Sequence, residues 1–286
     1  MEHSATKSAE KLLKEMGINQ LPIDPLLIAR EHGIEVRKMP SSQDGVSGIF
    51  MKVKNNFGIL YATHIDNSGY QRFSICHELG HYFLPGHHEI VLSADGIHAS
   101  KSGFISSEEH EIEADNFASG LLMPTFLFDQ ELEKRPSGLE GIIELSEVCR
   151  TSLTATAIRY AYRTPEPAAI VVSVADKVQY CFMSDELREY PGLSWIKKNS
   201  PLRRETLTFQ FNKDKNNIIN SLQTGGKTDL ITWFGGSIEG ELHEEVIGLG
   251  SYDKTLTILT ALDLPDPDEY KEDERLKESW TPRFKR

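Results

Sequence analysis

The chain has 286 residues, of which 39% are hydrophobic and 26% are charged, and its formal net charge is −12. This balance is typical of a soluble globular protein, and the length predicts about two domains. No segment approaches the roughly 18 apolar residues of a membrane span. The negative net charge makes the chain poorly suited to bind nucleic acid through its overall electrostatic field. Three widely spaced cysteines and an N-terminus without an apolar signal core indicate free thiols and a cytoplasmic location.

The first third of the chain predicts helices followed by a small sheet. Apolar residues at helical spacing up to Gly17 predict a first helix, and Pro25 begins a second. Short alternating segments bounded by turn residues predict strands at 34–36, 46–53 and 58–62, with a hairpin loop at Asn55-Asn56. The strand near 58–62 is either an ordinary sheet edge or an edge that could pair with an extended substrate backbone.

Two longer helices are predicted next, on either side of an irregular stretch. The first runs from about Gln71 to Leu84 and ends at Pro85, and the second runs from about Ser107 to Met123 and ends at Pro124. Residues 89–106 show no clear period, so we expect them to be irregular.

After residue 139 the pattern changes twice. Two short helices are expected between about 139 and 162, and Thr164–Pro167 has the composition of a linker. Beyond the linker, β-rich runs predict a separate sheet-containing domain with strands at 168–174, 178–183, 206–211, 229–234 and 255–262. Residues 263–278 hold eight acids against three bases and are expected to form an exposed arm.

The segment His77-Glu78-Leu79-Gly80-His81 predicts a metal centre. His77 and His81 are four residues apart on a helix, so both imidazoles project from one face and can hold one ion. Glu78 lies beside such an ion, where its carboxylate can take a proton from metal-activated water and return it to a leaving amine. An amphipathic helix with two surface histidines is the competing interpretation, but most of this helix is apolar. Gly80 would allow another element to pack closely against it.

A peptidase site needs a third protein ligand, and the residues alone offer two candidates. His87 follows His81 by six residues, but Leu84 stands where a chain-reversing glycine would be needed. Glu111 lies on the following helix together with Asp115, four residues further on, and Asp115 could accept the second N–H of a ligand histidine. Ala114 would let the two helices approach closely, and Glu113 is expected to be a solvated helix acid.

Two co-occurring motifs resemble the ImmA/IrrE family of metallopeptidases. RFSICHELGHYF is followed about thirty residues later by EIEADNFASGLLMP, and the resemblance spans roughly residues 5–125. It implies a zincin-like, gluzincin-type peptidase domain in which His77, His81 and Glu111 bind a divalent metal and Glu78 is the general base. Zinc fits two histidines and a carboxylate best, although manganese and iron accept the same set. His87 would then be a loop residue.

The resemblance also implies a domain organisation within an α+β protein. A metallopeptidase domain at 1–128 would be followed by a helix-turn-helix-like module at 129–164, a mixed α/β GAF-like domain at 165–264 and an acidic tail at 265–286. The module offers Arg159 and Arg163 but no basic face, so we expect a structural connector rather than a DNA-binding element.

The same resemblance implies a substrate. Relatives cleave helix-turn-helix transcriptional repressors in stress response or in the induction of mobile elements, so a repressor is the expected protein partner. In the GAF-like domain, Trp195, Trp233 and Phe234 could line a pocket for a small ligand or could simply be core residues. The alternative function is a non-enzymatic regulator in which the metal site is structural or sensory; an intact Glu78 argues against it, because a structural site needs no base.

Overall fold

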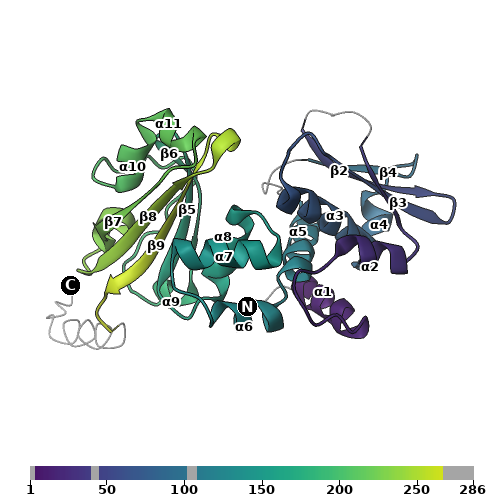
Figure 1. The fold of residues 1–286 in the computed structure, drawn as a ribbon, viewed down its shortest axis with the longest axis horizontal. Coiled ribbons are helices and arrows are strands. Elements are labelled where there is room, and N and C mark those ends of the chain that lie inside the picture. The colour runs from purple at the N-terminus through teal and green to yellow at the C-terminus, as the bar shows by residue number, and fades with distance from the viewer. Residues whose placement is uncertain (1–3, 40–44, 102–107, 267–286) are drawn as a thin grey trace, which may run out of the picture. The chain divides into compact units, whose positions relative to one another are not determined.

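The computed structural model describes residues 4–39, 45–101 and 108–266, and in it the chain divides into two compact units (Figure 1). The first unit comprises Met1–Arg135 with Ile142–Arg159, and the second comprises Pro136–Gly141 with Tyr160–Arg286. Each unit contains one β-sheet and several helices, so the predicted α+β class is confirmed. Within the described ranges, no helix is both long and apolar enough to cross a lipid bilayer.

The predicted domain limits stay a prediction. The residues expected to form the helical module contribute to both compact units. Of the predicted acidic tail, only its first two residues belong to the described part of the chain.

The helices of the first unit pack against a small sheet. They are α1 (Ser4–Glu15), α2 (Pro25–Glu31), α3 (Ser68–Phe83), α4 (His87–Val91), α5 (Glu109–Leu122), α6 (Thr125–Leu132) and most of α7 (Leu139–Cys149) and α8 (Leu153–Arg163). Pro25 occupies the first turn of α2, and Asp24 caps that helix by accepting from the Leu26 amide. Helix starts therefore follow the local chemistry that the sequence predicts.

The sheet of the first unit has four strands in the order β1-β3-β2-β4. β1 pairs parallel to β3, while β2 pairs antiparallel to both β3 and β4, and the strands are β1 (Glu35–Lys38), β2 (Val46–Val53), β3 (Asn56–Tyr61) and β4 (Ile97–Lys101). The predicted hairpin is therefore confirmed, although its turn is Lys54-Asn55 rather than the predicted Asn55-Asn56. The predicted edge strand near 58–62 is wrong, because β3 pairs on both sides and the edges are β1 and β4.

β4 lies in the stretch that was expected to be irregular. Its five residues, Ile-His-Ala-Ser-Lys, carry no strong strand pattern, and the pairing of Ile97–Lys101 with β2 is what orders them. Strand propensity in so short a segment depends on its neighbours rather than on its own residues.

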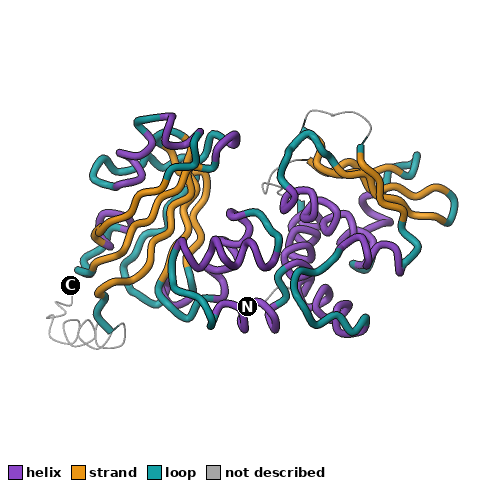
Figure 2. The backbone as a smooth tube through the Cα atoms, in the orientation of Figure 1, coloured by secondary structure: helices purple, strands orange, loops and turns teal. Residues whose placement is uncertain are grey.

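Helices α3 and α5 form the centre of the first unit. α3 contacts α5 along its length and also packs on β2 and β3, and Figure 2 shows the helices gathered against one face of that sheet. α1 covers the other side of α5, where a side chain at Gly120 would collide with Thr6. Close packing of small residues thus fixes the position of α5.

Helix α8 is tied to the first unit through Arg159. Its guanidinium is buried, donates to the Met123 carbonyl at 3.0 Å and to the Thr125 hydroxyl at 2.9 Å, and lies 3.8 Å from Glu10. Arg159 therefore stabilises the end of α5. Because its side chain is buried, it is not available to contact a DNA phosphate, the role considered for it in a helix-turn-helix-like module.

The second unit is built on an antiparallel five-stranded sheet in the order β6-β5-β9-β8-β7. Its strands are β5 (Ala168–Val174), β6 (Lys177–Met183), β7 (Gln223–Asp229), β8 (Glu241–Gly248) and β9 (Thr255–Asp263). β5 and β9 are buried over most of their length, as expected for interior strands of continuous apolar sequence. Short helices complete the unit: α9 (Asp185–Arg188), α10 (Leu207–Asn212), α11 (Lys215–Ile219), α12 (Leu230–Phe234) and the 3₁₀ turn η1 (Gly250–Tyr252).

Two predicted strands of this unit are helices. The segment expected as a strand at 206–211 forms α10, because the Thr206 hydroxyl accepts from the Phe209 amide and caps a helix start. The segment expected at 229–234 forms α12. The second unit instead obtains two strands from β7 and β8, whose glycines and glutamates gave little strand signal.

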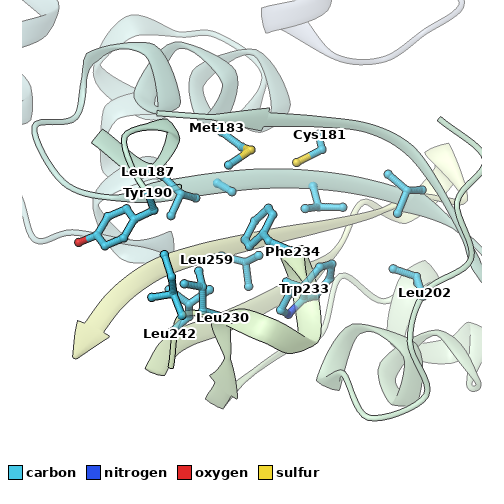
Figure 3. Packing of buried hydrophobic residues seen from close by; sticks show 14 residues of the cluster. Cys181, Met183, Leu187, Tyr190, Leu202, Leu230, Trp233, Phe234, Leu242 and Leu259 are labelled. Carbon is cyan, nitrogen blue, oxygen red and sulfur yellow. The ribbon is translucent and has the colours of Figure 1, made fainter. Parts of the chain in front are cut away.

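The main core of the second unit lies between the sheet and its connecting segments. Figure 3 shows Met183, Leu187, Trp233, Phe234 and Leu259 converging there from strands and helices far apart in sequence. A GAF-like assignment for this unit stays a prediction.

Candidate metal centre

Helix α3 presents the predicted site residues from a well-defined position. Asn67 caps the helix by accepting from the Tyr70 amide at 2.9 Å, and the helix ends at Phe83, two residues before Pro85. His77, Glu78 and His81 are all buried. Buried polar side chains need partners, so their surroundings decide what they can do.

Helix α5 approaches α3 closely at the site. A β-carbon at Gly80 would lie 3.1 Å from the Cα atom of Ala114, so even alanine at position 80 would require the two helices to shift by a few tenths of an ångström. The close approach that the sequence predicted at Gly80 and Ala114 is therefore confirmed. It brings Glu111 and Asp115 of α5 to the histidines of α3.

His77, His81 and Glu111 form a compact cluster of donor atoms. Nε2 of His77 is 3.1 Å from Nε2 of His81 and 3.3 Å from Oε2 of Glu111, while Nε2 of His81 is 3.5 Å from Oε1 of Glu111. One ligand atom from each residue lies within 4.8 Å of the others. A tetrahedral ion with ligands at about 2.0–2.2 Å separates its ligand atoms by roughly 3.3–3.5 Å, so these spacings fit a zinc-sized ion.

The outer nitrogens of both histidines are engaged by other residues. Nδ1 of His77 donates to Oδ1 of Asp115 at 2.8 Å. Nδ1 of His81 lies 3.4 Å from Nδ1 of His87, whose Nε2 donates to Oε2 of Glu113 at 3.0 Å. A neutral His87 that donates through Nε2 can only accept at Nδ1, so His81 donates there.

With Nδ1 protonated on both rings, His81 carries no hydrogen on Nε2, and neither does His77 in its neutral form. The Nε2 lone pairs of the two rings then face each other across only 3.1 Å. Oε1 of Glu111 is also buried without a hydrogen-bond partner among the described residues. A divalent cation would satisfy all three atoms at once, so the residues present fit the metal that the sequence implied.

His87 and Glu113 have roles that the sequence interpretation missed. His87 was expected to be a loop residue, but it is the buried first residue of α4 and its ring contacts the ring of His81. Glu113 was expected to be a solvated helix acid, and its carboxylate is indeed half-exposed, but it also binds His87. Spacing along the chain could not reveal this contact, because it depends on the turn at Pro85-Gly86 that brings α4 back toward α3.

His98 is a further histidine at the site that the sequence did not single out. It lies on β4, with Nε2 3.1 Å from Oε1 of Glu111 and its ring centroid 4.8 Å from that of His81. This Nε2 atom is buried and has no hydrogen bond of good geometry to a described residue. No motif carried the signal, because β4 itself was not predicted.

Glu78 is fully buried beside the cluster. Both of its carboxylate oxygens lack a hydrogen-bond partner within the described part of the chain, and a β-carbon at Gly48 of β2 would lie 2.3 Å from Oε1. Burial raises the pKa of Glu78, and positive charge on His77 partly offsets that shift. A carboxylate with a raised pKa and free oxygens is suited to accept and return a proton near neutral pH.

The charges in the cluster are strongly coupled. Burial alone would lower the pKa of His77, but hydrogen bonds to Asp115 and Glu111 outweigh it and raise that pKa to about 10. Burial lowers the pKa of His81 to about 4. The pKa of Glu111 is held below its ordinary value, because its contacts with the histidines outweigh the opposing effect of burial. Glu111 is therefore charged and His81 neutral, the states that metal ligands require, whereas His77 is protonated in the absence of an ion and would release that proton on binding one.

Comparison with protein families identifies the part of the chain that holds this cluster. Residues 29–160 match the IrrE N-terminal-like domain of the Peptidase_M78 family. The matched range of this IrrE-like domain includes all the site residues described above, and it supports a metallopeptidase of the ImmA/IrrE kind. No curated protein matches the chain.

Among solved structures, one with a similar fold over most of the chain is informative. It is a Mycobacterium tuberculosis transcriptional regulator, with a TM-score of 0.55 and 14% sequence identity over 93% of this chain and 82% of that one. At this identity the similarity concerns the fold alone, so the IrrE-like domain and its cluster carry the functional argument.

Proposed function

We propose that the first compact unit is a metal-dependent endopeptidase in which His77, His81 and Glu111 are the metal ligands and Asp115 orients His77. The observation that carries the proposal is Glu78, a fully buried carboxylate with two free oxygens next to a cluster that fits a divalent ion. Burying an unpaired carboxylate costs several kcal/mol in folding free energy, and a catalytic role for Glu78 would explain why the protein tolerates this cost. The match of residues 29–160 to a peptidase family supports the same activity.

The chain's own residues supply the acid–base chemistry. A divalent metal, with zinc the best fit to the donors, contributes Lewis-acid activation of water and of the scissile carbonyl. Glu78 accepts the proton of the attacking water and delivers it to the leaving amine. Asp115 and the His87–Glu113 pair hold the two ligand imidazoles in the tautomer that exposes Nε2.

The substrate is proposed to be an extended protein segment bound along β4. This strand is an edge of its sheet among the described strands, and it carries His98 beside the cluster. An edge strand can pair with a substrate backbone through main-chain hydrogen bonds. The resemblance to repressor-cleaving relatives makes a cytoplasmic helix-turn-helix repressor the proposed partner, with derepression of stress-response or mobile-element genes as the result.

The substitution Glu78→Gln tests the catalytic proposal. The amide keeps the shape of the side chain but cannot act as a base, so we expect metal content to stay the same and cleavage to fall by roughly 100-fold or more. Cleavage would be followed by mass spectrometry on a peptide library and on a co-expressed helix-turn-helix repressor. Glu109→Gln, at the start of α5, is the matched control and should cleave normally. Persistent cleavage by the Glu78 variant would exclude it as the base.

A second candidate is a non-enzymatic regulator with a structural or sensory metal. The observation that favours it is that the Mycobacterium tuberculosis protein of similar fold is a transcriptional regulator. Sequence-specific DNA binding in a gel-shift at physiological salt, without peptide cleavage, would support this alternative. We also propose that the second compact unit is GAF-like and binds a small ligand.

A further inference from the structure

A cavity of about 570 Å³ opens at the surface of the second unit, where Val178 of the edge strand β6 is one of its lining residues. Its lining comes from the segment around Trp195, from Leu202 to Thr206, and from the end of α12 at Trp233 and Phe234. This volume lies in the range of pockets that hold small molecules.

The floor of the cavity is apolar and fixed. Trp233, Phe234 and Leu202 line it and are at the same time buried members of the core cluster, as Figure 3 shows. The indole N–H of Trp233 donates to Oε2 of the fully buried Glu244 at 3.3 Å, and the other oxygen of Glu244 accepts from Thr208. The floor is therefore formed before any ligand binds.

The rim is held mainly through hydrogen bonds of its backbone. The Val178 amide donates to Ser200, the Asn199 amide donates to Val178, and the Ser194 amide donates to the Phe234 carbonyl at 2.8 Å. The carbonyl of Arg203 accepts from the Thr206 hydroxyl. These bonds fix the main chain and leave the rim side chains available.

The available side chains are an exposed aromatic ring and a set of cations. The Trp195 side chain is 48% exposed, and the Arg188 guanidinium lies 5.2 Å from its ring centroid. Arg203 and Arg204 line the cavity and are exposed, and no ion pair to a described residue is formed by either. Lys197 and Lys198 lie on the same segment and are also exposed.

This concentration of positive charge stands out in a chain of net charge −12. Glu205 is the single acid among the lining residues, so the lining itself is net positive. Unpaired arginines form strong, charge-assisted hydrogen bonds to phosphate and carboxylate, and an exposed tryptophan binds planar rings by stacking.

We propose that this cavity binds a small aromatic anion, a planar ring that stacks on Trp195 and carries a phosphate or carboxylate that binds Arg203 and Arg204. The inference deepens the small-ligand part of the proposed function. It is independent of the peptidase part, because it is measured by binding alone.

Isothermal titration of the full chain tests the proposal with two probes, adenosine monophosphate for a phosphate and 2-naphthoate for a carboxylate. At least one should bind with a Kd below about 1 mM, while adenosine and inorganic phosphate, which each lack one of the two features, should bind more weakly. The Arg203→Ala/Arg204→Ala double variant should weaken binding about tenfold or more, and Trp195→Ala about fivefold or more.

Lys227→Ala is the matched control, because Lys227 is an exposed cation of the same unit that does not line the cavity. It should bind the probes as the unchanged chain does. All substituted positions are exposed, and circular dichroism would verify folding. Failure of both probes to bind, or equal binding by the cavity variants, would overturn the proposal and leave the peptidase proposal untouched.

Discussion

At the scale of single residues, the site is organised by carboxylates and histidines that stand behind the proposed ligands. Asp115 fixes His77 directly, whereas His81 is held by His87, which Glu113 holds in turn. His98 occupies the corresponding position beside Glu111. Such outer partners set the tautomer and orientation of ligands and commonly affect metal affinity strongly.

The His98→Ala variant is expected to bind metal roughly 10- to 100-fold more weakly, because Glu111 loses the group that faces its free oxygen. Competition with a chromogenic chelator measures this affinity without reference to activity. His98→Gln retains a donor and should recover part of the loss. His64→Ala removes an exposed histidine of the same unit and serves as the control. Unchanged affinity in His98→Ala would mean that His98 does not position Glu111.

At the scale of secondary-structure elements, the contact between α3 and α5 determines whether the cluster forms. The proposed ligands come from two helices, and the contact between Gly80 and Ala114 sets how closely these helices pack. The hairpin of β2 and β3 could be predicted from its turn residues, but β4 could not, because only its pairing with β2 orders it. The segments of α10 and α12 were expected to be strands, because their aromatic and β-branched residues are typical of strands. The cap that Thr206 provides at the start of α10 explains why that segment is helical.

The Gly80→Val variant should lose about 1–3 kcal/mol of the free energy of unfolding, because the added side chain overpacks the interface with α5. It should also bind metal more weakly, since Glu111 moves away from His77 and His81. Denaturant titration and the chelator assay measure the two effects. Lys11→Val adds the same residue at an exposed position of α1 and should cost less than about 1 kcal/mol. Equal losses in both variants would count against the packing explanation.

At the scale of the whole molecule, two compact units with separate cores carry the two proposed functions. The proposed peptidase centre lies within the first unit, and the proposed anion cavity lies within the second. Ligands that bind only the folded form stabilise the unit that contains their site.

Metal removal is therefore expected to destabilise one unit selectively. A metal at 100 times its Kd stabilises the folded state by about 2.7 kcal/mol, so a chelator should lower the melting temperature of the first unit by several degrees. Differential scanning calorimetry should resolve a second transition that the chelator does not shift. In the His77→Ala variant the chelator should have little effect. A chelator shift of the same size in that variant would contradict the proposed ligand set.

The sequence by itself determined the chemistry of the candidate site. The i, i+4 histidines, the adjacent Glu78 and the Glu111–Asp115 pair follow from helical periodicity, which operates within one helix and needs no tertiary information. The tertiary structure decided which groups from other elements reach that site. His98 lies on β4, which is ordered only by its pairing with β2. His87 contacts Glu113 of α5 because the turn at Pro85-Gly86 directs α4 back toward α3. Contacts between elements depend on packing that local sequence patterns do not encode.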